Sequence, residues 1–162
     1  MKLYLQNKLI SLGESSYVLD EAGKNFFQVN GKVVSPTRKK FLCDLQGNTL
    51  YMIRNKYWHF FTHSAFICDS NGQKIVKIKE KFFGGYTLSG GKDEYEIKGK
   101  FLEGLYIYKN KQPIGRIARK PDFVSIFIRD GYEVEIYAPA DAALLTAFAV
   151  AYDNIQDQRK KD

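Results

Sequence analysis

Short apolar runs that alternate with polar residues recur along the chain, a pattern typical of half-buried β-strands. Three segments share one arrangement, an apolar run, then Asp-x-x-Gly, then a second alternating run: YVLDEAGKNFFQV, FLCDLQGNTLYMI and FICDSNGQKIVKI. Their aspartates are Asp20, Asp44 and Asp69. An Asp side chain bonds backbone two residues further on, and Gly accepts the positive φ of a tight turn. Each segment therefore predicts a β-hairpin.

Two further segments show the pattern more loosely. LYIYKNKQPIGRIA predicts a hairpin turning at Lys109-Asn110-Lys111, and VSIFIRDGYEVEIYA predicts one turning at Asp130-Gly131, a dipeptide favoured in two-residue type I′ loops. Between them and the repeats, GGYTLSGGKDEYEI has four glycines, so we expect a bulge there. With the N-terminal strand KLYLQ, the chain predicts about twelve strands in up-and-down order over residues 2–137.

A meander of this length predicts a closed barrel, because closure removes both sheet edges. An antiparallel barrel of about twelve strands has an interior too wide for side chains alone to fill. The segment DAALLTAFAVAYDNI supplies a filler, since residues 142–152 carry no charge and are apolar on every side of a helix. A membrane span needs about 20 apolar residues, so this run predicts a buried core helix instead.

The helix should begin at Asp141 as N-cap, end near residue 158, and leave the tail QDQRKKD in solvent. The chain then forms one mainly β domain, a roughly twelve-stranded antiparallel barrel enclosing a C-terminal hydrophobic helix. A single domain also fits the length of 162 residues.

The Asp-x-x-Gly hairpins, the opening KLYLQNKLISLGESSYVLDEAG and the closing APADAALLTAFAVAYDNI resemble the LURP-one-related proteins of the tubby-like superfamily, which also includes the phospholipid scramblases. The resemblance implies the same barrel around a central helix and no established catalytic activity. Relatives in the superfamily are associated with phosphoinositide binding, membrane tethering and scramblase-like roles. The tubby proteins' phosphoinositide-binding pattern is not recognisable in this sequence, so the resemblance assigns no lipid-contact residue.

A second repeat pairs a lysine with two large apolar residues, written K-Φ-Φ below. Its members are KLI at Lys8, KVV at Lys32, KYW at Lys56, KFF at Lys81 and KFL at Lys100. In a meander these segments lie at the rim opposite the Asp-x-x-Gly turns. We refer to that end as the K-Φ-Φ rim.

The K-Φ-Φ rim has two interpretations. In the one that we favour, the apolar pairs close the barrel mouth and the lysines are solvated gatekeepers. In the other, the lysines and exposed aromatic residues contact an anionic membrane. The candidate lipid-contact residues are then Lys32, Lys56, Lys81, Trp58 and Phe83, with Tyr57 and Phe82 beside them, and Lys77 and Lys79, which share one strand face with Lys81.

Charge and composition indicate the kind of partner and the cellular compartment, but they do not identify a ligand. The formal charge of +7 and pI near 9.3 predict attraction to anionic surfaces. The basic residues Arg38-Lys39-Lys40, Arg116, Arg119 and Lys120 are interpreted as further solvated positions, and the alternative is an anion-binding stripe. Cys43 and Cys68 occupy equivalent repeat positions too far apart for a disulfide and read as buried thiols. No secretory h-region is visible at the N-terminus, so we expect a cytoplasmic protein, peripheral at the membrane if lipid is bound.

No constellation of residues spells out a reaction. His59 and His63 lack neighbouring ligand residues, so we expect no metal and no cofactor. The serines have no recognisable activating motif, and the segment SGGK is too short for a P-loop. We therefore expect a non-catalytic barrel that binds anionic phospholipid headgroups or a protein partner, and the resemblance implies a scramblase-like role. The alternative is a barrel that binds single-stranded nucleic acid or only protein.

Overall fold

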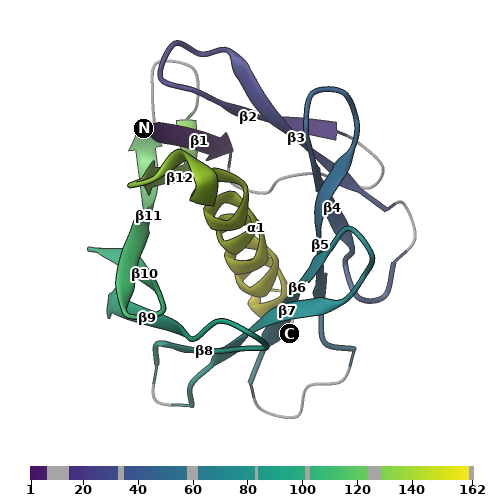
Figure 1. Ribbon diagram of the computed structural model, residues 1–162, viewed down its shortest axis with the longest axis vertical. Coiled ribbons are helices and arrows are strands. Elements are labelled where there is room, and N and C mark those ends of the chain that lie inside the picture. Colours follow the sequence, from purple (N-terminus) through teal and green to yellow (C-terminus); the bar gives the residue numbers. More distant parts are fainter. Residues whose placement is uncertain are drawn as a thin grey trace.

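The computed structural model describes residues 1–6, 15–32, 35–57, 62–82, 84–100, 103–123 and 129–160. Within them, twelve antiparallel strands surround one long helix (Figure 1). The strands are β1 (Lys2–Gln6), β2 (Ser15–Leu19), β3 (Asn25–Gly31), β4 (Lys40–Cys43), β5 (Thr49–Asn55), β6 (Ser64–Asp69), β7 (Lys74–Glu80), β8 (Tyr86–Gly90), β9 (Tyr95–Lys100), β10 (Gly104–Lys109), β11 (Gln112–Phe123) and β12 (Arg129–Ile136). A 3₁₀ turn, η1 (Pro139–Asp141), leads into α1 (Ala142–Arg159). The predicted fold is confirmed.

The three Asp-x-x-Gly turns are built alike, as the repeat predicts. The Asp44 carboxylate accepts the backbone N–H groups of Gln46 at 3.0 Å and Asn48 at 2.8 Å, while Gly47 takes φ +88°. Asp20 and Asp69 accept the corresponding pairs of N–H groups. The side chain thus satisfies backbone donors that the tight turn leaves unpaired.

Consecutive strands pair with one another around the sheet, except β8 and β9. The order is β8-β7-β6-β5-β4-β3-β2-β1-β12-β11-β10-β9, so β1 pairs with β12 while β8 and β9 end the ladder. The prediction that closure removes both edges was therefore wrong. Near the β8–β9 turn the Tyr95 ring fills the junction between these two strands. A β-carbon added to Gly90 would lie only 2.7 Å from that ring. We call the junction between these two edge strands the seam.

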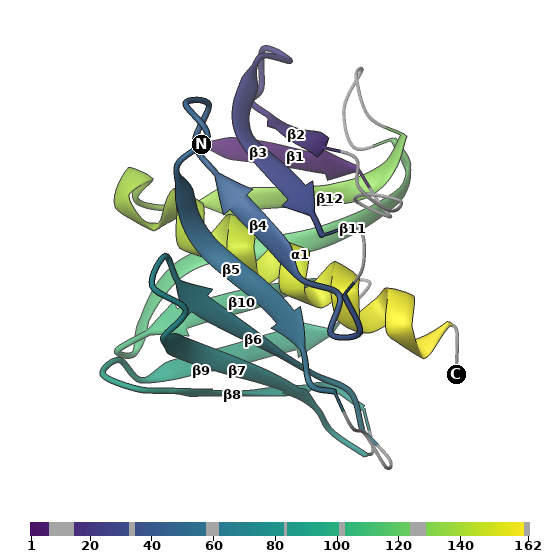
Figure 2. The ribbon, with the colours of Figure 1, turned by 90° about the vertical axis from the view of Figure 1, so that its right-hand side faces the viewer.

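The helix runs through the barrel from the Asp-x-x-Gly end to the K-Φ-Φ rim (Figure 2). Its residues from Leu144 to Ile155 are all buried, including Leu145 and Phe148. At Gly115 a β-carbon would lie 2.5 Å from Leu145 Cδ1, so the missing side chain lets the helix approach the wall. The apolar run therefore faces protein on every side, in keeping with its uniform hydrophobicity.

The helix ends differ in detail from the prediction. Asp141 occupies the N-cap position, but its side chain makes no capping hydrogen bond. The tail was expected in solvent, yet Gln156, Asp157 and Gln158 are only partly exposed. These residues still lie within the rim because the helix extends through it. Among the described residues, no helix combines the length and apolarity required for a membrane crossing.

Two other predictions have clear outcomes. Asp130 and Gly131 do not form a hairpin turn but lie inside β12, where Asp130 takes φ +46° beside a register shift between β11 and β12. A dipeptide that tolerates positive φ suits an irregular strand as well as a turn. Cys43 and Cys68 are free and buried, as predicted, and burial raises the pKa of the Cys68 thiol.

Candidate functional site

The K-Φ-Φ rim is confirmed as a structural feature by the positions of its lysines. Lys32, Lys56 and Lys81 each follow a strand directly, at the end of β3, β5 and β7, and all three are exposed. They lie at the end where α1 finishes (Figure 2). Trp58 and Phe83, predicted beside them, lie outside the described residues, as does Lys8.

Aromatic side chains next to two of these lysines point outward. Tyr57 is 59% exposed and Phe82 is 73% exposed, the highest values among the large apolar side chains that the structure describes. The interpretation in which the apolar pairs close the mouth therefore fails at these two positions. Lys81 also opens a turn in which the Gly84 N–H donates to the Lys81 carbonyl at 3.1 Å, so Phe82 projects from a tight loop.

Lys77 and Lys79 belong to a different surface from the rim lysines. Their neighbours Val76 and Ile78 are buried, so alternation places both lysines on the outside of the barrel wall. There the Phe66 ring has three cations within 6 Å of its centroid, at 5.0, 4.6 and 5.8 Å: Arg54, Lys74 and Lys77. The structure thus separates the predicted candidates into a rim group and a wall group.

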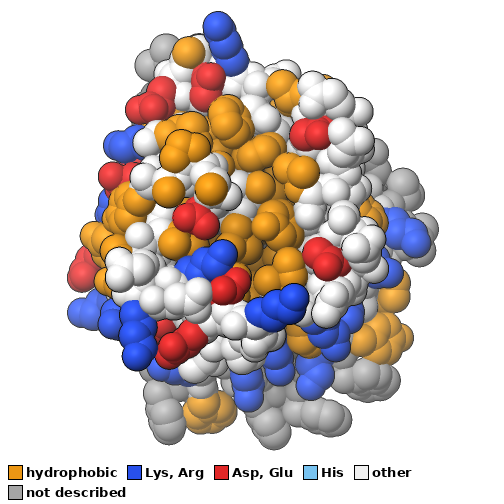
Figure 3. Space-filling model, in the orientation of Figure 1, with side chains coloured by type: hydrophobic (Ala, Val, Ile, Leu, Met, Phe, Trp, Pro, Cys, Tyr) orange, Lys and Arg blue, Asp and Glu red, His pale blue; other side chains and the backbone are white. Residues whose placement is uncertain are grey.

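The opposite mouth has a different character. Figure 3 looks onto the end where α1 begins and shows apolar side chains gathered over its centre. The exposed Leu45 and Tyr137 belong to this end, in an Asp-x-x-Gly turn and after β12 respectively. The two ends of the barrel are therefore chemically distinct.

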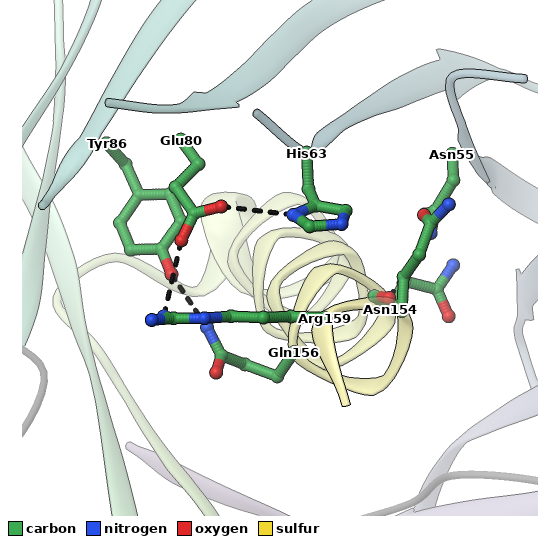
Figure 4. Close-up of polar contacts among 8 residues, drawn as sticks. Asn55, His63, Glu80, Tyr86, Asn154, Gln156 and Arg159 are labelled. Carbon is green, nitrogen blue, oxygen red and sulfur yellow. Dashed lines mark hydrogen bonds and ion pairs between the residues drawn. The ribbon is translucent and has the colours of Figure 1, made fainter. Parts of the chain in front are cut away.

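The last turns of α1 are held to the K-Φ-Φ rim by polar side chains. Glu80 lies between two partners (Figure 4), since its carboxylate is 3.2 Å from His63 Nδ1 and 3.3 Å from Arg159 Nη1. Gln156 Nε2 donates to the Tyr86 hydroxyl at 2.7 Å. Arg159 and Gln156 therefore each attach the helix end to a rim strand.

A second set of amide contacts lies on the other side of the helix. Asn55 Nδ2 donates to the Asn154 carbonyl at 3.2 Å, and Asn154 Nδ2 donates to the Arg38 carbonyl at 3.0 Å. Both side chains are buried. These hydrogen bonds give two backbone carbonyl groups a partner that replaces water.

A cavity of about 630 Å³ opens at the rim beside these contacts. Its walls come from the ends of β7, β8 and β9, and its floor from the helix and β10. Lys81, Lys100 and Arg159 supply cationic groups to its lining, and Tyr86, Tyr152 and Gln156 supply hydroxyl and amide groups. Its volume falls within the range of small-molecule pockets.

A buried ion pair lies just inside the rim. Lys40 Nζ is 3.2 Å from Asp153 Oδ2, and the Tyr132 hydroxyl donates to Asp153 Oδ1, also at 3.2 Å. The side chains of Lys40 and Asp153 are only 8% and 1% exposed. Burial raises the pKa of the Asp153 carboxyl, and Lys40 offsets part of that rise. Lys40 is therefore not one of the solvated basic points predicted from the sequence.

Tyrosine rings line the helix beside this pair. Tyr152 makes edge-to-face contacts with Tyr86 at 5.3 Å and with Tyr132 at 5.9 Å between ring centroids. Burial raises the pKa of Tyr132 and Tyr152, and it raises the pKa of Tyr95, near the opposite end, to about 12. These phenols therefore act as neutral hydrogen-bonding groups at physiological pH.

Comparison with known proteins agrees with this architecture. The family model described as LURP-one-related matches residues 1–153. The chain belongs to the LURP-one-related family. A crystal structure of an Arabidopsis thaliana protein aligns with a TM-score of 0.61 and 18% sequence identity, over 94% of this chain and 89% of that one. At this identity the likeness supports the fold alone. No curated protein matches the sequence.

The rim of this LURP-one-related barrel places charged and hydrogen-bonding side chains around the cavity. In the part of the chain that is described, no group of three or more His, Cys, Asp or Glu side chains could hold a metal ion. His63 contacts Glu80 instead, and His59 lies outside the described residues. The arrangement at the rim can supply charge and hydrogen bonds to a ligand.

Sequence reasoning missed several residues of the LURP-one-related rim. Glu80, Tyr86, Gln156 and Arg159 meet there from segments far apart in the chain. No repeat marks them, so their contacts depend on the depth at which the helix lies. Asp153 did carry a signal, because a charge within a helix enclosed on all sides requires a partner.

Proposed function

We propose that this barrel is a non-catalytic binding protein that attaches peripherally to membranes containing anionic phospholipids, using the K-Φ-Φ rim. The observation that carries the proposal is the exposure of Tyr57 and Phe82, each directly after an exposed rim lysine. Aromatic side chains favour the interfacial layer of a bilayer, and lysines favour its anionic headgroups. The combination at one end of the molecule fits a membrane-facing surface.

The charge of the whole chain acts in the same direction. A formal charge of +7 attracts the protein to an anionic leaflet before specific contacts form. The helix fills the barrel, so headgroups are bound from outside. The proposal therefore concerns attachment to the surface and does not require lipid to pass through the protein.

Replacing Lys32, Lys56 and Lys81 together with Gln should weaken binding to vesicles. Each lysine near an anionic surface contributes about 1 kcal/mol, so three account for a loss of roughly 100-fold in the partition coefficient. Flotation with vesicles of phosphatidylcholine alone and with added phosphatidylserine measures the effect. Binding of the parent protein should require phosphatidylserine and weaken as salt rises, because salt screens exposed charges.

A matched variant controls for net charge. Lys24, Lys74 and Lys111 are exposed at the Asp-x-x-Gly end, so converting them to Gln removes the same three charges from the other end. That variant should keep most of the binding. Equal losses of vesicle binding in the two variants would show that the rim lysines act only through net charge. If the parent protein does not bind acidic vesicles at low salt, the proposal is wrong. A gel shift with single-stranded DNA, run in parallel, tests the nucleic-acid alternative.

A further inference from the structure

The seam leaves backbone groups on two facing strands without a sheet partner in the described ladder. Two backbone hydrogen bonds show which residues of the β8 region bond to β7. The Lys81 N–H donates to the Gly85 carbonyl, and the Gly91 N–H donates to the Ile75 carbonyl. In an antiparallel pair, alternate residues bond one neighbour only. The N–H and C=O groups of Tyr86, Leu88 and Gly90 therefore face away from β7, toward the seam.

The rim cavity is the wide end of the seam. Tyr86 lines one side of it, and Gly99 and Lys100 line the other. At the far end the seam is filled, since the Tyr95 ring packs beside Gly90. An added strand could therefore reach β8 from the rim, with Tyr152 and Gln156 of the helix beneath it.

The two edges differ in how they resist pairing. β9 carries Glu96, Lys98 and Lys100, with Gly99 at φ +108°, and charges and irregular backbone are the usual protection of an exposed edge. β8 has the sequence Tyr-Thr-Leu-Ser-Gly, with neither a charge nor a proline. The β8 edge is therefore the one open to a further strand.

The charges around β8 indicate what that strand should carry. Lys77 and Lys79 lie opposite Ser89 and Thr87 in the β7–β8 register, on the outer face. From β9, Lys100 lines the cavity at the wide end of the seam, whereas Lys98 pairs with Glu96 at 3.2 Å. A second copy of this chain would bring the same lysines into apposition, whereas acidic side chains would meet opposite charge. Lys77 and Lys79, which lie apart from the rim, would then both contact the acidic side chains of the added strand.

We propose that the seam binds an extended acidic segment of a partner protein, which pairs antiparallel with β8. Residues opposite Tyr86 and Leu88 would turn inward toward the helix and should be apolar. The residues between them would turn outward toward the lysines and should be acidic. Main-chain hydrogen bonds supply affinity in this mode of recognition, and the alternating side chains supply selectivity.

The test titrates labelled protein with the peptide Glu-Val-Glu-Val-Glu-Val and follows amide exchange by NMR. At a peptide concentration about ten times its Kd, exchange of the Tyr86 and Leu88 amides should slow about tenfold, because little free protein remains. The peptide Lys-Val-Lys-Val-Lys-Val should leave both amides unchanged. A Glu-Val peptide N-methylated at the valines should also fail, since it lacks the donors that pair with β8.

A pair of variants separates backbone pairing from side-chain contact. Leu88→Pro removes the amide that faces the seam while leaving the β7 hydrogen bonds intact, a position where an edge strand tolerates proline. Leu88→Ala keeps that amide. The peptide should bind Leu88→Ala and not Leu88→Pro, with thermal unfolding showing that both are folded. If Leu88→Pro does not fold, the N-methylated peptide alone tests whether binding requires main-chain hydrogen bonds.

Four results with the peptides or the protein alone would overturn the proposal, and a fifth would come from vesicles. They are unchanged exchange at Tyr86 and Leu88, equal binding of the N-methylated peptide, equal binding by folded Leu88→Pro, or protection that grows with protein concentration without peptide, which would make a second copy the occupant. Phosphatidylserine vesicles that protect these amides when the acidic peptide does not would assign the seam to lipid. That last outcome refutes the peptide site and leaves attachment through the rim standing.

Discussion

A chain ending at Ala140 is expected to lose cooperative folding altogether. The shortened chain lacks α1, whose side chains Leu144, Leu145, Phe148, Val150 and Ile155 are almost wholly buried. Burial of such a side chain stabilises by about 1.5–3 kcal/mol, so these five account for roughly 8–15 kcal/mol. That sum matches the entire stability of a typical domain, about 5–15 kcal/mol. Calorimetry should show no unfolding transition.

Shortening the chain by less provides the control. Ending it at Arg159 keeps every residue of the helix, and the first residue removed, Lys160, is exposed. The midpoint of thermal unfolding should stay within a few degrees of the parent. A folded barrel in the chain that ends at Ala140 would show that the helix merely occupies the interior without supporting it.

Lys40→Met is expected to cost about 3–5 kcal/mol of unfolding free energy at neutral pH, because it removes one partner of a buried ion pair. Asp153 would keep the hydrogen bond from Tyr132 and lose its salt bridge with Lys40. Urea denaturation followed by circular dichroism measures the loss. The slope of free energy against urea should not change, since the same surface is exposed on unfolding.

The loss should also depend on pH with a definite sign. Burial raises the pKa of Asp153 in the folded protein above its usual value of 3.8. Removing the Lys40 charge raises that pKa further, so the folded variant binds a proton that the unfolded chain releases. Stability is then retained at acid pH and falls as pH rises from about 4 through the folded-state pKa. The variant should be closest to the parent near pH 4–5.

Two further variants test this explanation. Lys40→Met combined with Asp153→Leu removes both charges and should recover most of the loss, since an apolar pair of similar volume can replace a buried ion pair. Lys2→Met removes a surface pair with Glu133 and should change stability by about 1 kcal/mol or less. A Lys40→Met protein with the parent's stability and pH profile would contradict the assignment.

The parts of the fold that the sequence predicts are those encoded locally. Asp44, two residues and Gly47 specify a turn by themselves, and the apolar run around Phe148 specifies burial by its composition. Asp130-Gly131 shows where local coding is ambiguous, because the same dipeptide suits a turn and an irregular strand. The open seam has no local signature, since it depends on how twelve strands share the circumference.

The candidate sites also divide into features that are encoded locally and features that depend on the complete fold. The regular spacing of Lys32, Lys56 and Lys81 is enough to predict that they share one rim. The contacts of Glu80 with His63 and Arg159 could not be predicted, because they require the depth and rotation of the helix. The prediction for Lys40 was wrong for a related reason: its neighbours Arg38 and Lys39 suggested a solvated cluster, and its partner lies 113 residues away.

The position of α1 after all twelve strands has a consequence for biosynthesis. At about 5–20 residues per second, the 22 residues from Asp141 to Asp162 take roughly 1–4 s to synthesise. During those seconds all twelve strands exist, but the apolar inner faces have nothing to pack against. The nascent barrel is then at its most prone to aggregation, and the synthesis of α1 ends that exposure.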